Sequence, residues 1–130
     1  MKEWPGNEEC LILLEKAIDL AKEGYPSVDK IRQLGEGWVG DEALAIAVYC
    51  ALPYPDDFAK GLILSVNHDG DSDSTGAVTG NIMGAYLGIT SIPKKWIENI
   101  ELKAEIIQLS DDLLAGYESE KGWEEKYPGW

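Results

Sequence analysis

The sequence predicts an all-α protein that forms a single helical domain over residues 1–130. Apolar residues recur at three- and four-residue spacing along most of the chain, and Gly or Pro separates successive periodic segments. Hydrophobic residues make up 45% of the chain, which is enough for one core at this length. We find no internal repeat, no linker and no second domain.

Two helices are expected before residue 36. Asn7 can cap a helix that stops at Gly24, just before Pro26. The periodic apolar residues of this helix are Leu11, Leu14, Ala17, Ile18 and Ala21. Ser27 can then cap a short helix that ends at Gly35.

Two further helices should follow before the most polar part of the chain. Asp41 can cap an apolar helix over residues 42–52. Pro53 and Pro55 end that helix, and Pro55 suits the first position of the next one, which continues to Val66.

The C-terminal half begins with an acidic loop over residues 67–74, which precedes a helix over residues 75–87. A turn is expected at Pro93. A last amphipathic helix is predicted over 101–116, and its apolar face carries Leu102, Ile106, Leu109 and Leu113. An acidic, aromatic tail at 118–130 can either fray or dock through its rings.

Four glycines at intervals of four occupy the helix after the acidic loop and its C-terminal end. They are Gly76, Gly80, Gly84 and Gly88. Positions four apart share one helix face, so these residues favour the close approach of a neighbouring helix. We prefer this interpretation to a phosphate-binding role.

The charge and the cysteines limit the classes of function. With 24 acidic and 11 basic residues the formal charge is −13, which argues against binding to nucleic acid or to anionic membranes. No apolar run is long enough to span a bilayer, and no signal sequence is recognisable. Cys10 and Cys50 lie in apolar helical contexts and are expected to be buried free thiols. A cytoplasmic location is the expectation.

The acidic loop is the most informative part of the chain. Asp69, Asp71 and Asp73 alternate, and hydroxyl side chains at Ser72, Ser74 and Thr75 stand beside them. Carboxylates this close repel one another unless a cation lies among them. Hard oxygen ligands suit Mg²⁺, Mn²⁺ or Ca²⁺ rather than zinc. The loop therefore predicts part of a metal site at the start of a helix.

Two other interpretations of the loop compete with this one. It could be a solvated polar connection between helices. It could also be an EF-hand-like calcium loop that begins at Asp69, with Asp71 and Asp73 at its third and fifth positions. In that register Ser74 stands where the sixth-position glycine is required, and Gly80 stands where the bidentate glutamate is required.

The chain resembles the ADP-ribosylglycohydrolase family over most of residues 10–116. The resemblance is carried by His68-Asp69-Gly70-Asp71-Ser72-Asp73-Ser74-Thr75-Gly76, which looks like the C-terminal metal motif of that family. It extends upstream to Leu34-Gly35-Glu36-Gly37-Trp38-Val39 and to Asp41-Glu42-Ala43-Leu44-Ala45-Ile46-Ala47, and downstream to Ile92-Pro93-Lys94-Lys95-Trp96.

The resemblance implies a compact all-α fold that holds two divalent ions, usually Mg²⁺ or Mn²⁺, and that hydrolyses ADP-ribosyl glycosidic bonds. Asp71 and Asp73 would be carboxylate ligands, and Ser74 a hydroxyl ligand. Residues two apart in an extended loop point the same way, which agrees with this assignment. Such ions can polarise ribose hydroxyls or position a water molecule.

The family's N-terminal part has no counterpart in this sequence. That part supplies a Thr/Ser-Asp-Asp motif, the catalytic acid and much of the ADP-ribose pocket, so the catalytic residues are unknown here. The chain can be a hydrolase completed by an N-terminal partner fragment. Alternatively, it is a non-catalytic remnant that acts as a cation-binding or oligomerising module. Without that fragment we expect a homodimer, because Leu44, Ile46 and Val48 or the glycine-rich helix would be left partly uncovered.

Several other polar or aromatic residues receive structural interpretations. His68 is expected to be a hydrogen-bonded structural group rather than a general base. Ser110-Asp111-Asp112 imitates the absent motif but is interpreted as a solvated helix face. Asp56-Asp57 and Glu42 suit first helical turns, and Trp38 is expected in the core.

Overall fold

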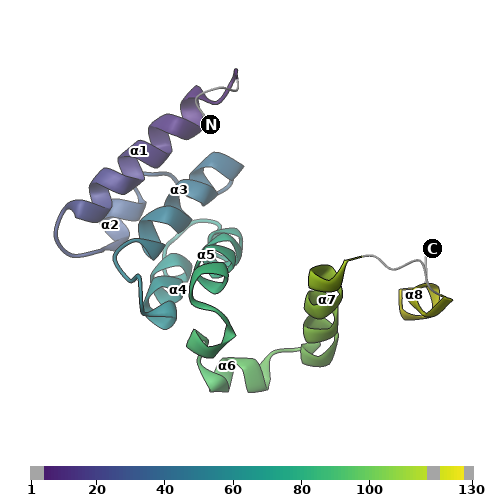
Figure 1. Ribbon diagram of the computed structural model, residues 1–130. Coiled ribbons are helices and arrows are strands. Elements are labelled where there is room, and N and C mark those ends of the chain that lie inside the picture. Colours follow the sequence, from purple (N-terminus) through teal and green to yellow (C-terminus); the bar gives the residue numbers. More distant parts are fainter. Residues whose placement is uncertain (1–4, 117–120, 128–130) are drawn as a thin grey trace. The chain divides into compact units, whose positions relative to one another are not determined.

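The computed structural model describes residues 5–116 and 121–127, and all regular structure within these ranges is helical (Figure 1). The helices are α1 (Glu8–Lys22), α2 (Val28–Ile31), α3 (Gly40–Ala51), α4 (Phe58–Val66), α5 (Ser72–Leu87), a 3₁₀ turn η1 (Ile89–Ser91), α6 (Lys94–Asn99), α7 (Lys103–Ala115) and α8 (Lys121–Lys126). The predicted all-α class is confirmed. Among these helices none has the length and apolar character needed to cross a membrane.

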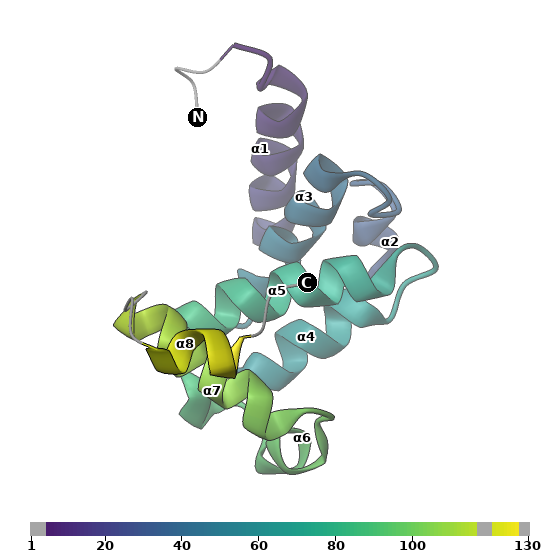
Figure 2. The ribbon, with the colours of Figure 1, turned by 90° about the vertical axis from the view of Figure 1, so that its right-hand side faces the viewer.

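The described residues form two compact units, Met1–Pro93 and Lys94–Trp130. In the first unit α3 lies at the centre and contacts α1, α4 and α5, and α4 lies beside α5 (Figures 1 and 2). The single domain expected over 1–130 stays a prediction. The acidic loop belongs to the first unit, where it connects α4 to α5.

Helix α3 supplies much of the core because small and apolar residues lie on most sides of the helix. Its buried residues are Ala43, Ala45, Ile46, Ala47, Tyr49 and Cys50. The hydroxyl of Tyr49 accepts the backbone N–H of Ser27 at 2.9 Å, which satisfies this buried polar group and ties α3 to the start of α2. Leu44, Ile46 and Val48 on this helix were expected to be partly uncovered. That expectation was wrong for Ile46, which is fully buried, while Leu44 and Val48 are half-buried.

The glycines of α5 differ in what lies opposite them. A Cβ added at Gly76 would come within 2.6 Å of Val66 on α4, so glycine is needed there for close approach. A Cβ at Gly80 would be in ordinary contact with α4, at 3.9 Å from Leu62, and one at Gly84 would meet nothing within 4 Å. Gly88 ends the helix with φ +75. The predicted close approach is therefore confined to the N-terminal half of α5.

In the second unit α7 buries none of its residues. The exposed apolar residues on this helix are Ile106, Ile107, Leu109, Leu113 and Leu114. Asp112 anchors α8, since its carboxylate pairs with Lys126 at 2.6 Å and accepts the hydroxyl of Tyr127 at 2.6 Å. The ring of Tyr127 also contacts that of Trp123. The described part of the tail therefore docks on α7, whereas Glu118 and Trp130 lie outside the described residues.

Candidate metal centre

The predicted metal ligands lie at the N-terminus of α5. This helix begins at Ser72, three residues earlier than expected, so Asp71 is its N-cap and Asp73 and Ser74 are in its first turn. Asp71 and Asp73 were expected in an extended loop that points both side chains the same way. This expectation was wrong, because Asp73 lies within the helix. An EF-hand-like loop from Asp69 is also excluded, because most of its twelve positions are helical.

Asp69 is paired with a cationic side chain. The Arg32 guanidinium binds the Asp69 carboxylate at 2.8 Å and the Asp29 carboxylate of α2 at 2.6 Å. Hydrogen bonding to Arg32, followed by the attraction of its charge, holds the pKa of Asp69 below its usual range. The first of the three alternating carboxylates therefore has its counter-charge within the protein.

For Asp71, no Lys or Arg is among the groups that shift its pKa. Its pKa is lowered by side-chain hydrogen bonding with Asp73 first and with Ser74 second. As the N-cap and two first-turn residues, Asp71, Asp73 and Ser74 lie at the positive end of the α5 dipole. These are the residues that the sequence analysis named as ligands.

His68 holds the loop in place through both ring nitrogens. Its Nδ1 accepts the backbone N–H of Gly70 at 3.1 Å, so Nε2 carries the proton and donates to Thr75 Oγ1 at 2.9 Å. The buried Thr75 hydroxyl donates in turn to the carbonyl of Ser65 at 2.7 Å. His68 is therefore hydrogen-bonded at both ring nitrogens, as expected, and its structural role stays a prediction.

A turn over residues 35–37 lies against the acidic loop. The carbonyl of Glu36 accepts the backbone N–H of Asp71 at 2.7 Å. The carboxylate of Glu42 accepts the backbone N–H groups of Glu36 at 3.1 Å and Gly37 at 3.0 Å. These two contacts of Glu42 were not predicted from the sequence. The sequence signal for such a contact was the pair of glycines at 35 and 37, which permit a tight turn shortly before the acidic first turn of α3.

The remaining aromatic and acidic candidates are placed as follows. The core position expected for Trp38 was wrong, since this side chain is 67% exposed and its Nε1 donates to the Glu36 carboxylate at 3.0 Å. Asp56 and Asp57 precede α4 and do not lie in its first turn; Asp57 is the N-cap and accepts the N–H of Lys60 at 3.0 Å. Asp112 serves α8, so it is not available as a substitute ligand.

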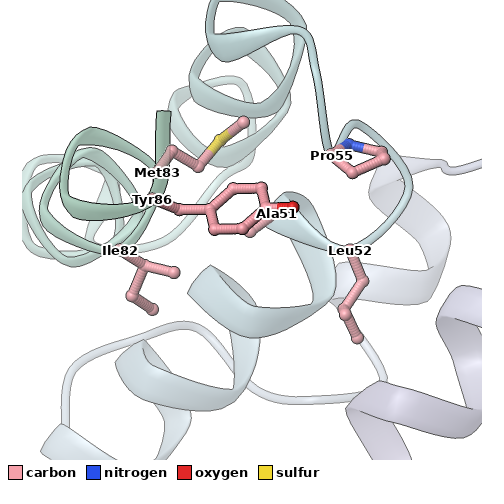
Figure 3. A pocket seen from close by; sticks show the side chains of 6 residues that line it. All are labelled: Ala51, Leu52, Pro55, Ile82, Met83 and Tyr86. Atoms are coloured by element: carbon pink, nitrogen blue, oxygen red, sulfur yellow. The ribbon is translucent and has the colours of Figure 1, made fainter. Parts of the chain in front are cut away.

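An apolar pocket lies at the opposite end of α5 (Figure 3). Its lining consists of Ala51, Leu52, Pro55, Ile82, Met83 and Tyr86. In the figure the ring of Tyr86 extends from α5 towards the end of α3. Ten residues of helix separate Asp73 from Met83, a rise of about 15 Å, so this pocket is distinct from the acidic loop.

The donor set at the start of α5 fits a hard divalent cation in part. Two carboxylates and a hydroxyl are the oxygen ligands that Mg²⁺ and Mn²⁺ prefer. Mg²⁺ requires six ligands in octahedral geometry, so most of the coordination sphere must come from water or from other protein groups. Within residues 5–116 and 121–127, no three His, Cys, Asp or Glu side chains gather closely enough to hold a metal ion by themselves.

Comparison with known proteins decides the family. The model of the ADP-ribosylglycohydrolase family matches residues 2–122, which is nearly the whole chain. The chain belongs to the ADP-ribosylglycohydrolase family. The resemblance inferred from the acidic loop and its flanking segments is thus confirmed.

Three curated relatives illustrate the range of similarity. ADP-ribosyl-[dinitrogen reductase] glycohydrolase of Rhodospirillum rubrum is 42% identical over 62 residues, covering 46% of this chain and 21% of that protein. ADP-ribosylhydrolase ARH3 of Mus musculus is 29% identical over 111 residues, 77% of this chain and 30% of the relative. ADP-ribosylarginine hydrolase Tri1 of Pseudomonas putida is 32% identical over 99 residues, 75% and 25% respectively.

This member of the ADP-ribosylglycohydrolase family therefore spans between a fifth and a third of the length of these relatives. No solved structure matches the chain.

Proposed function

We propose that this chain takes part in the metal-dependent hydrolysis of ADP-ribosyl glycosidic bonds and that it contributes Asp71, Asp73 and Ser74 to the metal site. Family membership supports the class of reaction. The single observation that supports the site is the position of these three residues together at the start of α5, inside the matched region. ADP-ribosylated molecules are the proposed substrates.

The chain's own residues have distinct tasks in this proposal. Asp71 and Asp73 offer anionic oxygen atoms to Mg²⁺ or Mn²⁺, and Ser74 offers its hydroxyl. Arg32 and His68 hold the two ends of the loop through Asp69 and Thr75. When bound, the cation would polarise the ribose hydroxyls or a water molecule of the substrate complex.

We also propose that groups outside this sequence complete the metal coordination and supply the catalytic acid. Three donors leave a divalent cation short of ligands, and no side chain described here is assigned as the acid that acts on the leaving group. We therefore expect an N-terminal family fragment to be the partner that supplies both. The isolated chain should bind the cation weakly and should not turn over substrate.

The experiment is a hydrolase assay on ADP-ribosylated protein with Mg²⁺ or Mn²⁺, using the chain alone and the chain mixed with an N-terminal family fragment. Turnover only in the mixture, and its loss in Asp71→Asn with Asp73→Asn, would support the proposal. Metal-dependent turnover by the chain alone would contradict the need for completion. A mixture that stays inactive, while an intact family member acts on the same substrate, would contradict the hydrolase proposal.

A second candidate is a non-catalytic module that binds a cation or associates with a second copy of itself. The exposed apolar residues of α7 favour this candidate, because contiguous apolar surface is commonly covered by symmetric association. A homodimer without activity in any mixture would favour it over the hydrolase.

A further inference from the structure

We propose that Glu42 is a positioning residue that holds the 35–37 turn and, through this turn, the main chain of Asp71. The proposal rests on the proposed function, since it concerns how the chain prepares the metal ligand Asp71. Glu42 does not itself belong to the ligand set at the start of α5.

The first step is the attachment of Glu42 to the turn. One oxygen of its carboxylate accepts two successive backbone N–H groups, those of Glu36 and Gly37, at 3.1 and 3.0 Å. Hydrogen bonds to an ionised acceptor are stronger than bonds between neutral groups. Gly35 has φ +125, and a Cβ there would overlap the Glu42 carboxyl group, so this backbone and this carboxylate fit only when residue 35 is glycine.

The second step is the attachment of the turn to the acidic loop. The Glu36 carbonyl accepts the Asp71 N–H at 2.7 Å. A Cβ at Gly70 would overlap this same carbonyl, and a Cβ at Gly37, which has φ +85, would lie 2.8 Å from the Thr75 side chain. The two backbone segments are therefore in direct contact, and no side chain separates them.

The third step is the consequence for Asp71. Its N–H is fixed by Glu36, and its carbonyl accepts the backbone N–H of Thr75 at 3.2 Å in the first turn of α5. Loss of the Glu42 carboxylate would leave two N–H groups of the turn without their acceptor and would free the carbonyl of Glu36 to move. Groups that orient metal ligands typically contribute ~10–100-fold to metal affinity.

The test compares Glu42→Ala with Glu42→Gln, because a glutamine oxygen can still accept both N–H groups. Hydrogen exchange without metal should be faster in Glu42→Ala at the amides of Glu36, Gly37 and Asp71, with amides late in α5 unchanged. Titration with Mn²⁺, followed by electron paramagnetic resonance, should show affinity reduced ~10-fold or more in Glu42→Ala. Glu42→Gln keeps the acceptor oxygen and loses the charge, so its exchange rates and its affinity should lie between those of the wild type and Glu42→Ala.

Wild-type exchange at Asp71 in Glu42→Ala would overturn the proposal, and so would equal loss in both variants, which would indicate an effect of charge. If Glu42→Ala fails to fold, Gly70→Ala is the second variant. Its added methyl group displaces the Glu36 carbonyl while Glu42 is retained, and the same loss is expected. A wild-type chain that binds no Mn²⁺ would contradict the proposed function, and the exchange rates would still decide whether Glu42 holds Asp71.

Discussion

Three aspartates that are equivalent in the sequence pattern have different surroundings in the structure. Asp69 is paired with Arg32, whereas hydrogen bonding to Asp73 first and to Ser74 second lowers the pKa of Asp71. The sequence could not show this difference, because Arg32 is thirty-seven positions away and only the fold brings it to Asp69. Because Arg32 neutralises Asp69, Asp71 and Asp73 are the two carboxylates of the loop that we expect to bind a cation.

The two thiols should differ in reactivity. Cys50 is fully buried and desolvation raises its pKa to about 12, whereas Cys10 is only half-buried. Since the thiolate is the reactive form, Cys10 should react with a disulfide reagent in the native protein and Cys50 only after unfolding. The Cys10→Ser variant isolates Cys50, and absorbance of the released thiolate measures the rate.

The raised pKa also sets a direction for stability. The ordinary pKa of a cysteine thiol is 9.0, and below this pH the neutral, buried thiol makes its full contribution to the free energy of unfolding. This contribution is lost as the pH rises towards the pKa of about 12 in the folded protein. Reaction of Cys50 in the native Cys10→Ser protein as fast as in denaturant would contradict its burial.

At the scale of elements, α5 offers a matched pair of glycines. Gly76 faces Val66 closely and Gly84 faces open space. Gly76→Leu should therefore lower the free energy of unfolding by ~1–3 kcal/mol, the usual result of overpacking. Gly84→Leu is the control with the same helix propensity change, and it should be neutral or slightly stabilising. Denaturant titration measures both, and equal effects would mean that α4 does not approach α5 at Gly76.

Asp112 should hold α8 on α7. Hydrogen bonding to Lys126 first, and to Tyr127 second, lowers the pKa of Asp112 below its usual value of 3.8. A lowered pKa means that this contact stabilises the folded state above about pH 3.8 and is lost as the pH falls through the lowered value. Asp112→Asn should speed hydrogen exchange in residues 121–127 at neutral pH. Asp111→Asn removes the same charge and should leave that exchange unchanged.

The helices themselves were largely predictable, but their starts and their neighbours were not. Periodicity and the Gly and Pro breaks located every long helix, because these signals are local. The start of α5 at Ser72 was missed because Asp71 fits an N-cap and the following Ser and Asp residues fit a first turn as well as a loop. The Glu42 contact was missed because it depends on a turn geometry at Gly35 that no periodicity encodes.

At the scale of the whole molecule, the exposed face of α7 and the charge have opposite effects. Apolar residues such as Leu109 and Leu113, 47% and 75% exposed, favour association, while a formal charge of −13 opposes it. Salt screens the repulsion and leaves the apolar contribution. Light scattering should therefore show a homodimer whose fraction rises with ionic strength.

A double substitution on α7 separates the apolar effect from the charge effect. Leu109→Lys with Leu113→Lys changes the formal charge from −13 to −11, which reduces repulsion, yet it should abolish association because it breaks the apolar face. Ile12→Lys with Ile63→Lys makes the same charge change at exposed positions outside α7 and should preserve the dimer. A wild-type monomer at all salt concentrations would contradict the expectation.

Mn²⁺ titration by calorimetry tests most directly the proposal that this member of the ADP-ribosylglycohydrolase family binds a divalent cation at the start of α5. We predict weak, single-site binding that is lost in Asp71→Asn with Asp73→Asn. Asp69→Asn should retain it, because Arg32 already occupies that carboxylate. Unchanged binding in the double variant, or no binding by the wild-type chain, would contradict the claim.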